Sequence, residues 1–124
     1  IAPMTNPQKR KGSAFERLVA DYLSERMACE RIPAGATVDR GDLWTAAAAI
    51  QCKNQARLSL GAWLDATQQQ QAAAGKPLHA LVVKRRGVTA PERQLVVMTL
   101  QQLRDLLASC NDPQHDASGG RGAP

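Results

Sequence analysis

The chain has 124 residues, three cysteines and a formal net charge of +5 at pH 7. This length fits one domain, and no apolar run reaches the roughly 18 residues that a membrane-spanning helix needs. The cysteines are widely spaced and form no Cys-x-x-Cys pair, which argues against a disulfide framework and a zinc site. We therefore expect a cytoplasmic protein without a membrane association. Its basic balance favours an anionic partner, with nucleic acid first.

The N-terminal part predicts a basic arm followed by a helix. Residues 1–12 are polar and basic, and we expect them to be flexible. Ser13 and Glu16 have the spacing of a capping box, so we predict a helix over 14–27 that Ser13 caps. The apolar residues of this segment follow helical spacing, at Phe15, Leu18, Val19, Tyr22 and Leu23.

The rest of the chain predicts strands and helices in alternation. We expect about three strands over 29–54, a helix over 60–74, strands over 79–83 and 94–99, and a helix over 100–109. In the last helix, Leu103, Leu106 and Leu107 should point inward, and residues 111–124 should form a disordered tail. The order is αβββαββα. It predicts an α/β domain over 13–110, in which helices flank one mixed sheet.

A hairpin within residues 29–54 would bring three polar side chains together. Gln51 and Lys53 are two positions apart, so on a strand they share one face, roughly 7 Å apart. Asp42 lies four residues before Ala46, and Gln51 lies four residues after Ala47. If the chain turns between these two alanines, Asp42 lies opposite Gln51.

These residue types suit phosphodiester hydrolysis. Mg²⁺ binds oxygen ligands, often one or two carboxylates, and keeps several waters. It polarises the phosphate and helps to generate the nucleophile. A lysine beside the metal can orient the attacking water and offset the developing charge.

The same segments resemble a known family. The motifs are Lys11-Gly12-Ser13 with Glu16-Arg17, then Arg40-Gly41-Asp42, then Ile50-Gln51-Cys52-Lys53. In order and spacing they are similar to the PD-(D/E)XK nuclease superfamily, and within it to archaeal-type Holliday junction resolvases and their phage relatives. The likeness runs from about Lys11 to Gly87.

The resemblance implies a fold, an activity and a set of site residues. The fold would be restriction-endonuclease-like, and the protein a homodimer that cuts branched DNA, such as Holliday junctions, with Mg²⁺ or Mn²⁺. It would work in the cytoplasm of a bacterium or of a phage-infected host cell. Glu16, Asp42 and Gln51 would bind the metal, and Lys53 would be the catalytic lysine. Ser13 would contact the substrate or the metal shell. A glutamine of the second helix would join the site as a DNA contact, and among Gln68 to Gln71 we favour Gln70.

Gln51 departs from the family pattern, which has glutamate at this position. A carboxamide oxygen can ligate a cation, but it lacks the negative charge that attracts Mg²⁺. The glutamine is either a natural variant of an active enzyme or an inactivating substitution. In the second case the chain is a DNA-binding module of the same fold. A basic adaptor for RNA or a partner protein is a third interpretation.

Basic residues near these motifs predict where DNA would bind. We expect phosphate contacts from Lys9, Arg10, Lys11, Arg40, Lys84, Arg85 and Arg86. Each could instead be a solvated surface charge, and the run from Lys84 to Arg86 could simply protect the end of a strand.

Overall fold

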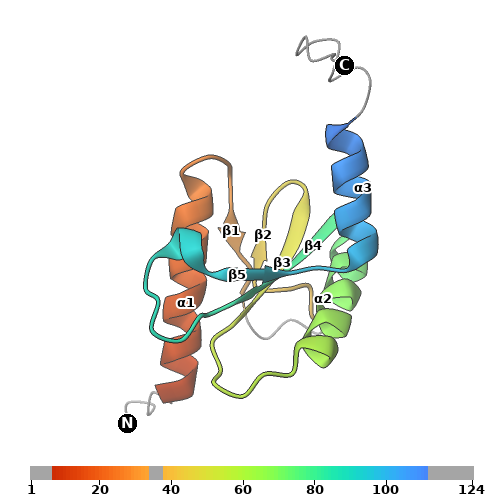
Figure 1. The fold of residues 1–124 in the computed structure, drawn as a ribbon. Coiled ribbons are helices and arrows are strands. Elements are labelled where there is room, and N and C mark those ends of the chain that lie inside the picture. The colour runs from red at the N-terminus through yellow and green to blue at the C-terminus, as the bar shows by residue number, and fades with distance from the viewer. Residues whose placement is uncertain (1–6, 34–37, 112–124) are drawn as a thin grey trace.

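The computed structural model describes residues 7–33 and 38–111. Figure 1 shows three helices packed around one sheet. The elements, in chain order, are α1 (Pro7–Ser24), β1 (Glu30–Arg31), β2 (Leu43–Trp44), β3 (Ala48–Lys53), α2 (Leu60–Ala74), β4 (Leu78–Val83), the short 3₁₀ helix η1 (Pro91–Arg93), β5 (Leu95–Val97) and α3 (Leu100–Cys110).

The five strands form one mixed sheet in the order β1-β2-β3-β4-β5. Strands β3 and β4 are parallel, and every other neighbouring pair is antiparallel. A parallel pair needs a crossover connection, which α2 supplies. Helices α1 and α2 lie on opposite sides of the sheet (Figure 1). The predicted mixed sheet with flanking helices is therefore confirmed.

Helix α1 begins earlier than the sequence predicted. It starts at Pro7, so residues 7–12 are helical and the prediction of a flexible arm is wrong for them. Proline is favoured at the first position of a helix because its missing N–H would have no partner there. Ser13 consequently lies inside the helix and is not its N-cap, and its pairing with Glu16 as a capping box was wrong. Residues 1–6 lie outside the described part.

One face of α1 and one face of the sheet make the core. The buried side chains of the helix are Phe15 and Val19 of the predicted stripe, together with Ala20. Tyr22 of that stripe is exposed. They pack against Leu43, Ile50, Cys52 and Val82 of the sheet. Since strand residues alternate between faces, this arrangement turns Gln51 and Lys53 to the other face, toward α2.

Helix α2 has the boundaries that the sequence predicted. Gly75 ends it in the left-handed conformation, with φ of +68°, and its N–H is shared by the carbonyls of Ala72 and Gln71. The helix buries two polar residues, Thr67 and Gln70. Thr67 satisfies its hydroxyl within the helix by donating to the carbonyl of Trp63 at 2.7 Å. Gln70 has a different environment, which belongs to the candidate site.

The prediction for the leucines of α3 was wrong. Leu103 and Leu107 are exposed, Leu106 is only half-buried, and no residue of α3 is buried. The amphipathic pattern correctly predicted a helix, but the pattern does not specify which partner covers its apolar side. Of the tail expected over 111–124, Asn111 is the C-cap of α3, and residues 112–124 lie outside the described part.

Hydrogen bonds to His79 hold α3 against the sheet. Gln102 accepts from the His79 backbone N–H at 2.9 Å and donates to the His79 carbonyl at 2.8 Å. The backbone N–H of Thr99, which caps α3, points to Nε2 of the buried His79 ring at 3.2 Å. The other ring nitrogen lies 2.9 Å from Gln71 of α2. A neutral ring with its proton on Nδ1 satisfies both contacts.

Candidate active site

The hairpin register is the one inferred from the sequence. Leu43 pairs with Ile50 and Trp44 with Ala49, so the next position in the pairing sets Asp42 level with Gln51. The backbone N–H of Asp42 still donates to the Ile50 carbonyl, at 2.9 Å. Beyond this point the side chain of Asp42 replaces the backbone as the hydrogen-bond acceptor: its Oδ2 accepts from the Cys52 N–H at 2.8 Å. The carboxylate is thereby fixed at the point where regular β2–β3 pairing ends.

A turn at Gly41 places Asp42 in this position. Gly41 has φ of +100°, a conformation that favours glycine. A Cβ there would lie 3.2 Å from the Ile50 carbonyl oxygen, closer than most real contacts. Oδ1 of Asp39 accepts from the Gly41 N–H at 3.0 Å and stabilises the turn. We did not single out Asp39 from the sequence, although an Asp two residues before a glycine is a recognisable turn signal.

The environment of Asp42 disfavours its charged form. Burial raises its pKa from 3.8 to about 6, and the neighbouring carboxylates of Glu16 and Asp39 add to the increase. The Cys52 N–H and the Lys53 ammonium act in the opposite direction without cancelling it. The neighbouring carboxylates create a negative electrostatic potential at Asp42, and a bound cation would neutralise it.

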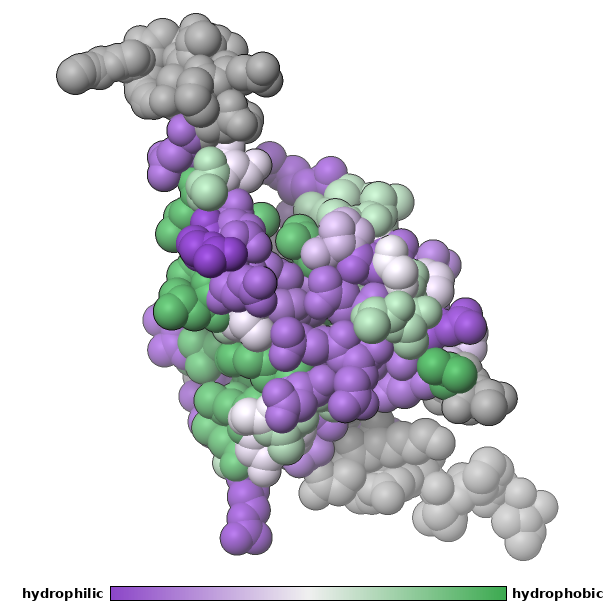
Figure 2. Space-filling model, turned by 90° about the vertical axis from the view of Figure 1, so that its right-hand side faces the viewer, coloured by the Kyte–Doolittle hydropathy of each residue, from purple (hydrophilic) through white to green (hydrophobic). Residues whose placement is uncertain are grey.

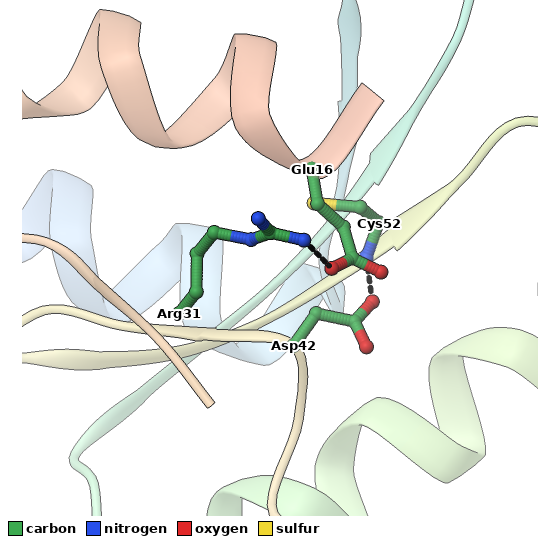
Figure 3. A network of polar contacts seen from close by, with 4 residues as sticks. All are labelled: Glu16, Arg31, Asp42 and Cys52. Carbon is green, nitrogen blue, oxygen red and sulfur yellow. Dashed lines mark hydrogen bonds and ion pairs between the residues drawn. The ribbon is translucent and has the colours of Figure 1, made fainter. Parts of the chain in front are cut away.

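Glu16 approaches Asp42 from α1, which lies on the opposite side of the sheet from α2. Figure 3 shows its side chain descending from α1 toward the Asp42 carboxylate. Oε1 of Glu16 is 3.3 Å from a guanidinium nitrogen of Arg31, on β1. Arg31 was not predicted as a site residue, because nothing in the sequence indicates that β1 ends beside α1. It offsets part of the negative charge that the two carboxylates bring together.

Within the part of the chain that the structure describes, two carboxamide oxygens in this region are buried without a hydrogen-bond partner. They are Oε1 of Gln51 and Oε1 of Gln70. Nε2 of Gln70 donates to Oδ2 of Asp39 at 2.7 Å, which fixes the orientation of the amide because a carboxylate can only accept. An unsatisfied buried polar atom typically costs about 1–3 kcal/mol. Such an atom is a candidate ligand for a cation or an ordered water.

Lys53 lies at the end of β3 beside an aromatic ring. Its ammonium nitrogen is 5.5 Å from the centroid of Trp63, on α2. Within residues 7–33 and 38–111, no carboxylate oxygen lies within 4.0 Å of it. The ring is an electrostatic partner that leaves all three ammonium hydrogens available. Nothing in the sequence indicates that Trp63 lies beside Lys53.

The donor set fits a hard divalent cation. Glu16 and Asp42 supply carboxylate oxygens from two elements, and Gln51 adds an unsatisfied carboxamide oxygen. Mg²⁺ binds through one or two carboxylates and keeps several waters, so it needs no larger cage of protein ligands. No cluster of three or more His, Cys, Asp or Glu residues suited to a metal occurs among the described residues. The third protein oxygen would therefore have to be an amide.

Four of the seven basic residues predicted to contact DNA belong to α1 or to the turn before Asp42. Arg10, Lys11 and Arg40 are exposed, as a phosphate contact would require. Ser13 is half-buried in the middle of α1. Lys9 lies in the same helix, but its side chain lies outside the described part.

The other three predicted contacts lie in the loop that follows β4, at the same end of the sheet as Lys53. The Lys84 ammonium donates to the carbonyls of Arg85 and Val88, so it stabilises the loop. Arg85 donates to the Arg93 carbonyl at 3.2 Å. Arg86 is exposed and contacts Asn54, the residue after β3. Of the three, Arg86 presents the most accessible charge.

Comparison of the chain with protein-family models, with curated proteins and with solved structures finds no match. Across the described residues, no helix combines the length and the hydropathy of a membrane span.

Proposed function

We propose that the protein is a metal-dependent endodeoxyribonuclease of the PD-(D/E)XK type that acts on branched DNA, such as Holliday junctions. The observation that carries the proposal is the convergence of Glu16, Asp42, Gln51 and Lys53 from α1 and the β2–β3 hairpin. The five-stranded mixed sheet with its flanking helices is compatible with such a fold. The resemblance in motif order supplies the reaction class.

Each residue has a role that its environment supports. Asp42 and Glu16 would hold Mg²⁺ or Mn²⁺, with Oε1 of Gln51 as a neutral third oxygen. Lys53, which has no carboxylate partner among the residues that the structure describes, would orient the attacking water and stabilise the charge that develops on the phosphate. A bound metal would supply Lewis-acid polarisation of the phosphate. Gln70 would place its fixed carbonyl oxygen toward a water or the substrate.

The positions of the basic residues support a path for DNA across the site. Arg40 lies two residues before Asp42, and Arg86 contacts Asn54, the residue after Lys53. Arg10 and Lys11 lie on α1, a turn or more before Glu16. A strand that crosses these charges would pass the carboxylates. The proposed setting is the cytoplasm of a bacterium or a phage-infected cell, with the protein acting as a homodimer.

In a second candidate function, the protein has the same fold but no nuclease activity. Because Gln51 carries no charge, the site holds fewer carboxylates than the family pattern requires. This observation favours a module that binds branched DNA without cutting it.

One experiment separates the two functions. The wild type, Gln51→Glu and Lys53→Ala proteins are incubated with labelled four-way, Y-shaped and linear DNA in Mg²⁺ or Mn²⁺. Cutting by both the wild type and Gln51→Glu, but not by Lys53→Ala, supports the nuclease. Cutting by Gln51→Glu alone supports the binding module. If neither protein nicks any substrate, the nuclease proposal is wrong. Gln69→Glu, at an exposed position of α2, controls for the added charge.

A further inference from the structure

A small cleft lies beside Lys53, on the same face of the sheet. Lys53 pairs with Val83 of β4, and Val83 pairs with Leu95 of β5, so the three residues form one row across the strands. Residues paired in this way point to the same face. Neighbouring strands are about 4.8 Å apart, which places the Leu95 backbone roughly 10 Å from that of Lys53. Val83 and Leu95 line the cleft, which therefore opens next to the proposed catalytic lysine.

Part of the lining of this cleft is apolar. Val83 is buried, whereas Leu95 and Leu58 are 48% and 55% exposed. Leu58 belongs to residues 54–59, which connect β3 to α2. Figure 2, which faces α2 and α3, shows hydrophobic side chains at the surface along one side of the molecule, next to hydrophilic ones. Two exposed leucines in one hollow leave apolar surface in contact with water, and a ligand that covered it would gain free energy.

The other part of the lining is basic. Lys84, Arg85 and Arg86 follow β4 and contribute three positive charges. Arg57, exposed in the connection that carries Leu58, adds a fourth charge nearby. No acidic residue is among the described side chains that line the cleft. A ligand that fits it therefore combines negative charge with an apolar surface.

Hydrogen bonds hold the basic side of the cleft in shape. Oε1 of Gln94 accepts from the Arg85 backbone N–H at 2.8 Å. Nε2 of Gln94 donates to two carbonyls of the loop that follows β4, at 3.0 and 2.9 Å. Arg86 donates to Asn54, which joins this loop to the connection between β3 and α2. The cleft is thus formed before any ligand binds, so little binding energy is lost in ordering it.

We propose that this cleft receives an unpaired nucleotide of the DNA strand that passes Lys53. Its volume is about 270 Å³, near the lower end of the roughly 300–1,000 Å³ of small-molecule sites. This size suits one ring system and excludes a helix or strand of a protein partner. Unpaired bases pack against apolar side chains and against the planes of arginine guanidinium groups. Leu58 and Leu95 offer the first kind of contact, and Arg86 offers the second, while the basic side attracts the phosphates.

This inference rests on the proposed function and narrows its substrate. Lys53 and the cleft share one row of the sheet, so a strand whose phosphate lies at Lys53 can place a neighbouring base in the cleft. Only a base that is free of its pairing partner can leave the helix at little cost. The preferred DNA therefore has an unpaired nucleotide at its branch point, next to the phosphate to be cut.

The test compares two four-way junctions that differ by one unpaired thymidine at the branch point. Binding of the full chain is measured by fluorescence anisotropy at one salt concentration, with a chelator present so that no DNA is cut. The wild type should bind the junction with the unpaired thymidine at least about fivefold more tightly than the fully paired one. Leu58→Ser/Leu95→Ser should bind both junctions equally, and Leu58→Ser alone should reduce the preference by at least about half. Leu100→Ser, at an exposed leucine of α3 outside the cleft, should keep the full preference.

The cleft is refuted if the wild type binds neither junction or binds both equally, or if Leu100→Ser loses the preference as the double variant does. A full preference in the double variant refutes it as well. Circular dichroism checks that the variants are folded, and if the double variant is not, Leu58→Ser alone decides. These outcomes are separate from the cleavage assay. A protein that prefers the unpaired nucleotide but cuts no DNA in metal would refute the nuclease and keep the cleft, and one that cuts without the preference would do the reverse.

Discussion

Replacing Asp42 by asparagine should stabilise the folded protein in metal-free buffer at alkaline pH. Burial and two neighbouring carboxylates raise the pKa of Asp42 from 3.8 to about 6, so folding with an ionised Asp42 is costly. The difference between the two pKa values corresponds to about 3 kcal/mol. We expect a gain of about 2 kcal/mol, because the half-buried side chain keeps some contact with water. Asparagine can still accept the Cys52 N–H through its Oδ1.

The gain should depend on pH in a defined direction. The folded state binds the Asp42 proton more tightly than the unfolded chain does, so the cost of ionisation grows as pH rises from about 4 to 6 and is then constant. Urea unfolding with a chelator present should therefore give about 2 kcal/mol at pH 8 and less than 1 kcal/mol at pH 4. Asp65→Asn, at an exposed carboxylate of α2, should change stability by less than about 0.5 kcal/mol. A loss of stability in Asp42→Asn at pH 8, or a gain independent of pH, would refute the reasoning.

Three further predictions follow from other parts of the molecule. Gly41→Ala should destabilise the protein by about 1–3 kcal/mol, and by more than Gly75→Ala does. Gly41 combines a positive φ with a close approach to a carbonyl, whereas a Cβ on Gly75 meets open space. Equal losses of stability in urea unfolding would contradict this. Burial lowers the pKa of His79 from 6.5, so the unfolded chain binds its proton more readily, and stability should be full above pH 6.5 and fall below it. Urea unfolding of the Asp42→Asn protein should show this loss of stability, and adding His79→Gln should abolish it. If the loss persists in the double variant, a group other than His79 causes it. Junction DNA binding, measured by fluorescence anisotropy, should weaken at least about tenfold between 50 and 200 mM salt, with a shallower slope in Arg86→Ala; a flat response in the wild type would exclude the proposed phosphate contacts.

The parts of the fold with local determinants could be predicted from the sequence. Gly75 and Pro77 specify the end of α2, and the strand alternation over 50–53 specifies which residues face the core. The turn after Thr45 sets the hairpin register, and with it the level of Asp42 and Gln51. Each of these features depends on neighbours within about ten residues, which is why reading the sequence alone was sufficient.

The features that depend on distant contacts could not be predicted. Arg31 meets Glu16, and Asp39 meets Gln70, only because separate elements pack together. The same applies to Trp63 beside Lys53. The exposure of the α3 leucines has a related cause: helical spacing shows that a helix has an apolar side without showing what covers it. The early start of α1 is the exception, since Pro7 was a local signal for a helix start that the capping-box pattern at Ser13 obscured.

The most direct test of the central claim is the single-turnover rate of junction nicking by the wild type and by Lys53→Ala at saturating Mn²⁺. Lys53 has no carboxylate partner within 4.0 Å in the described part, so alanine there removes the proposed catalytic charge and leaves the proposed metal ligands in place. We predict nicking that requires the metal and falls at least about 100-fold in the variant. Equal rates in the two proteins, or nicking that persists in a chelator, would show that this site does not cut DNA.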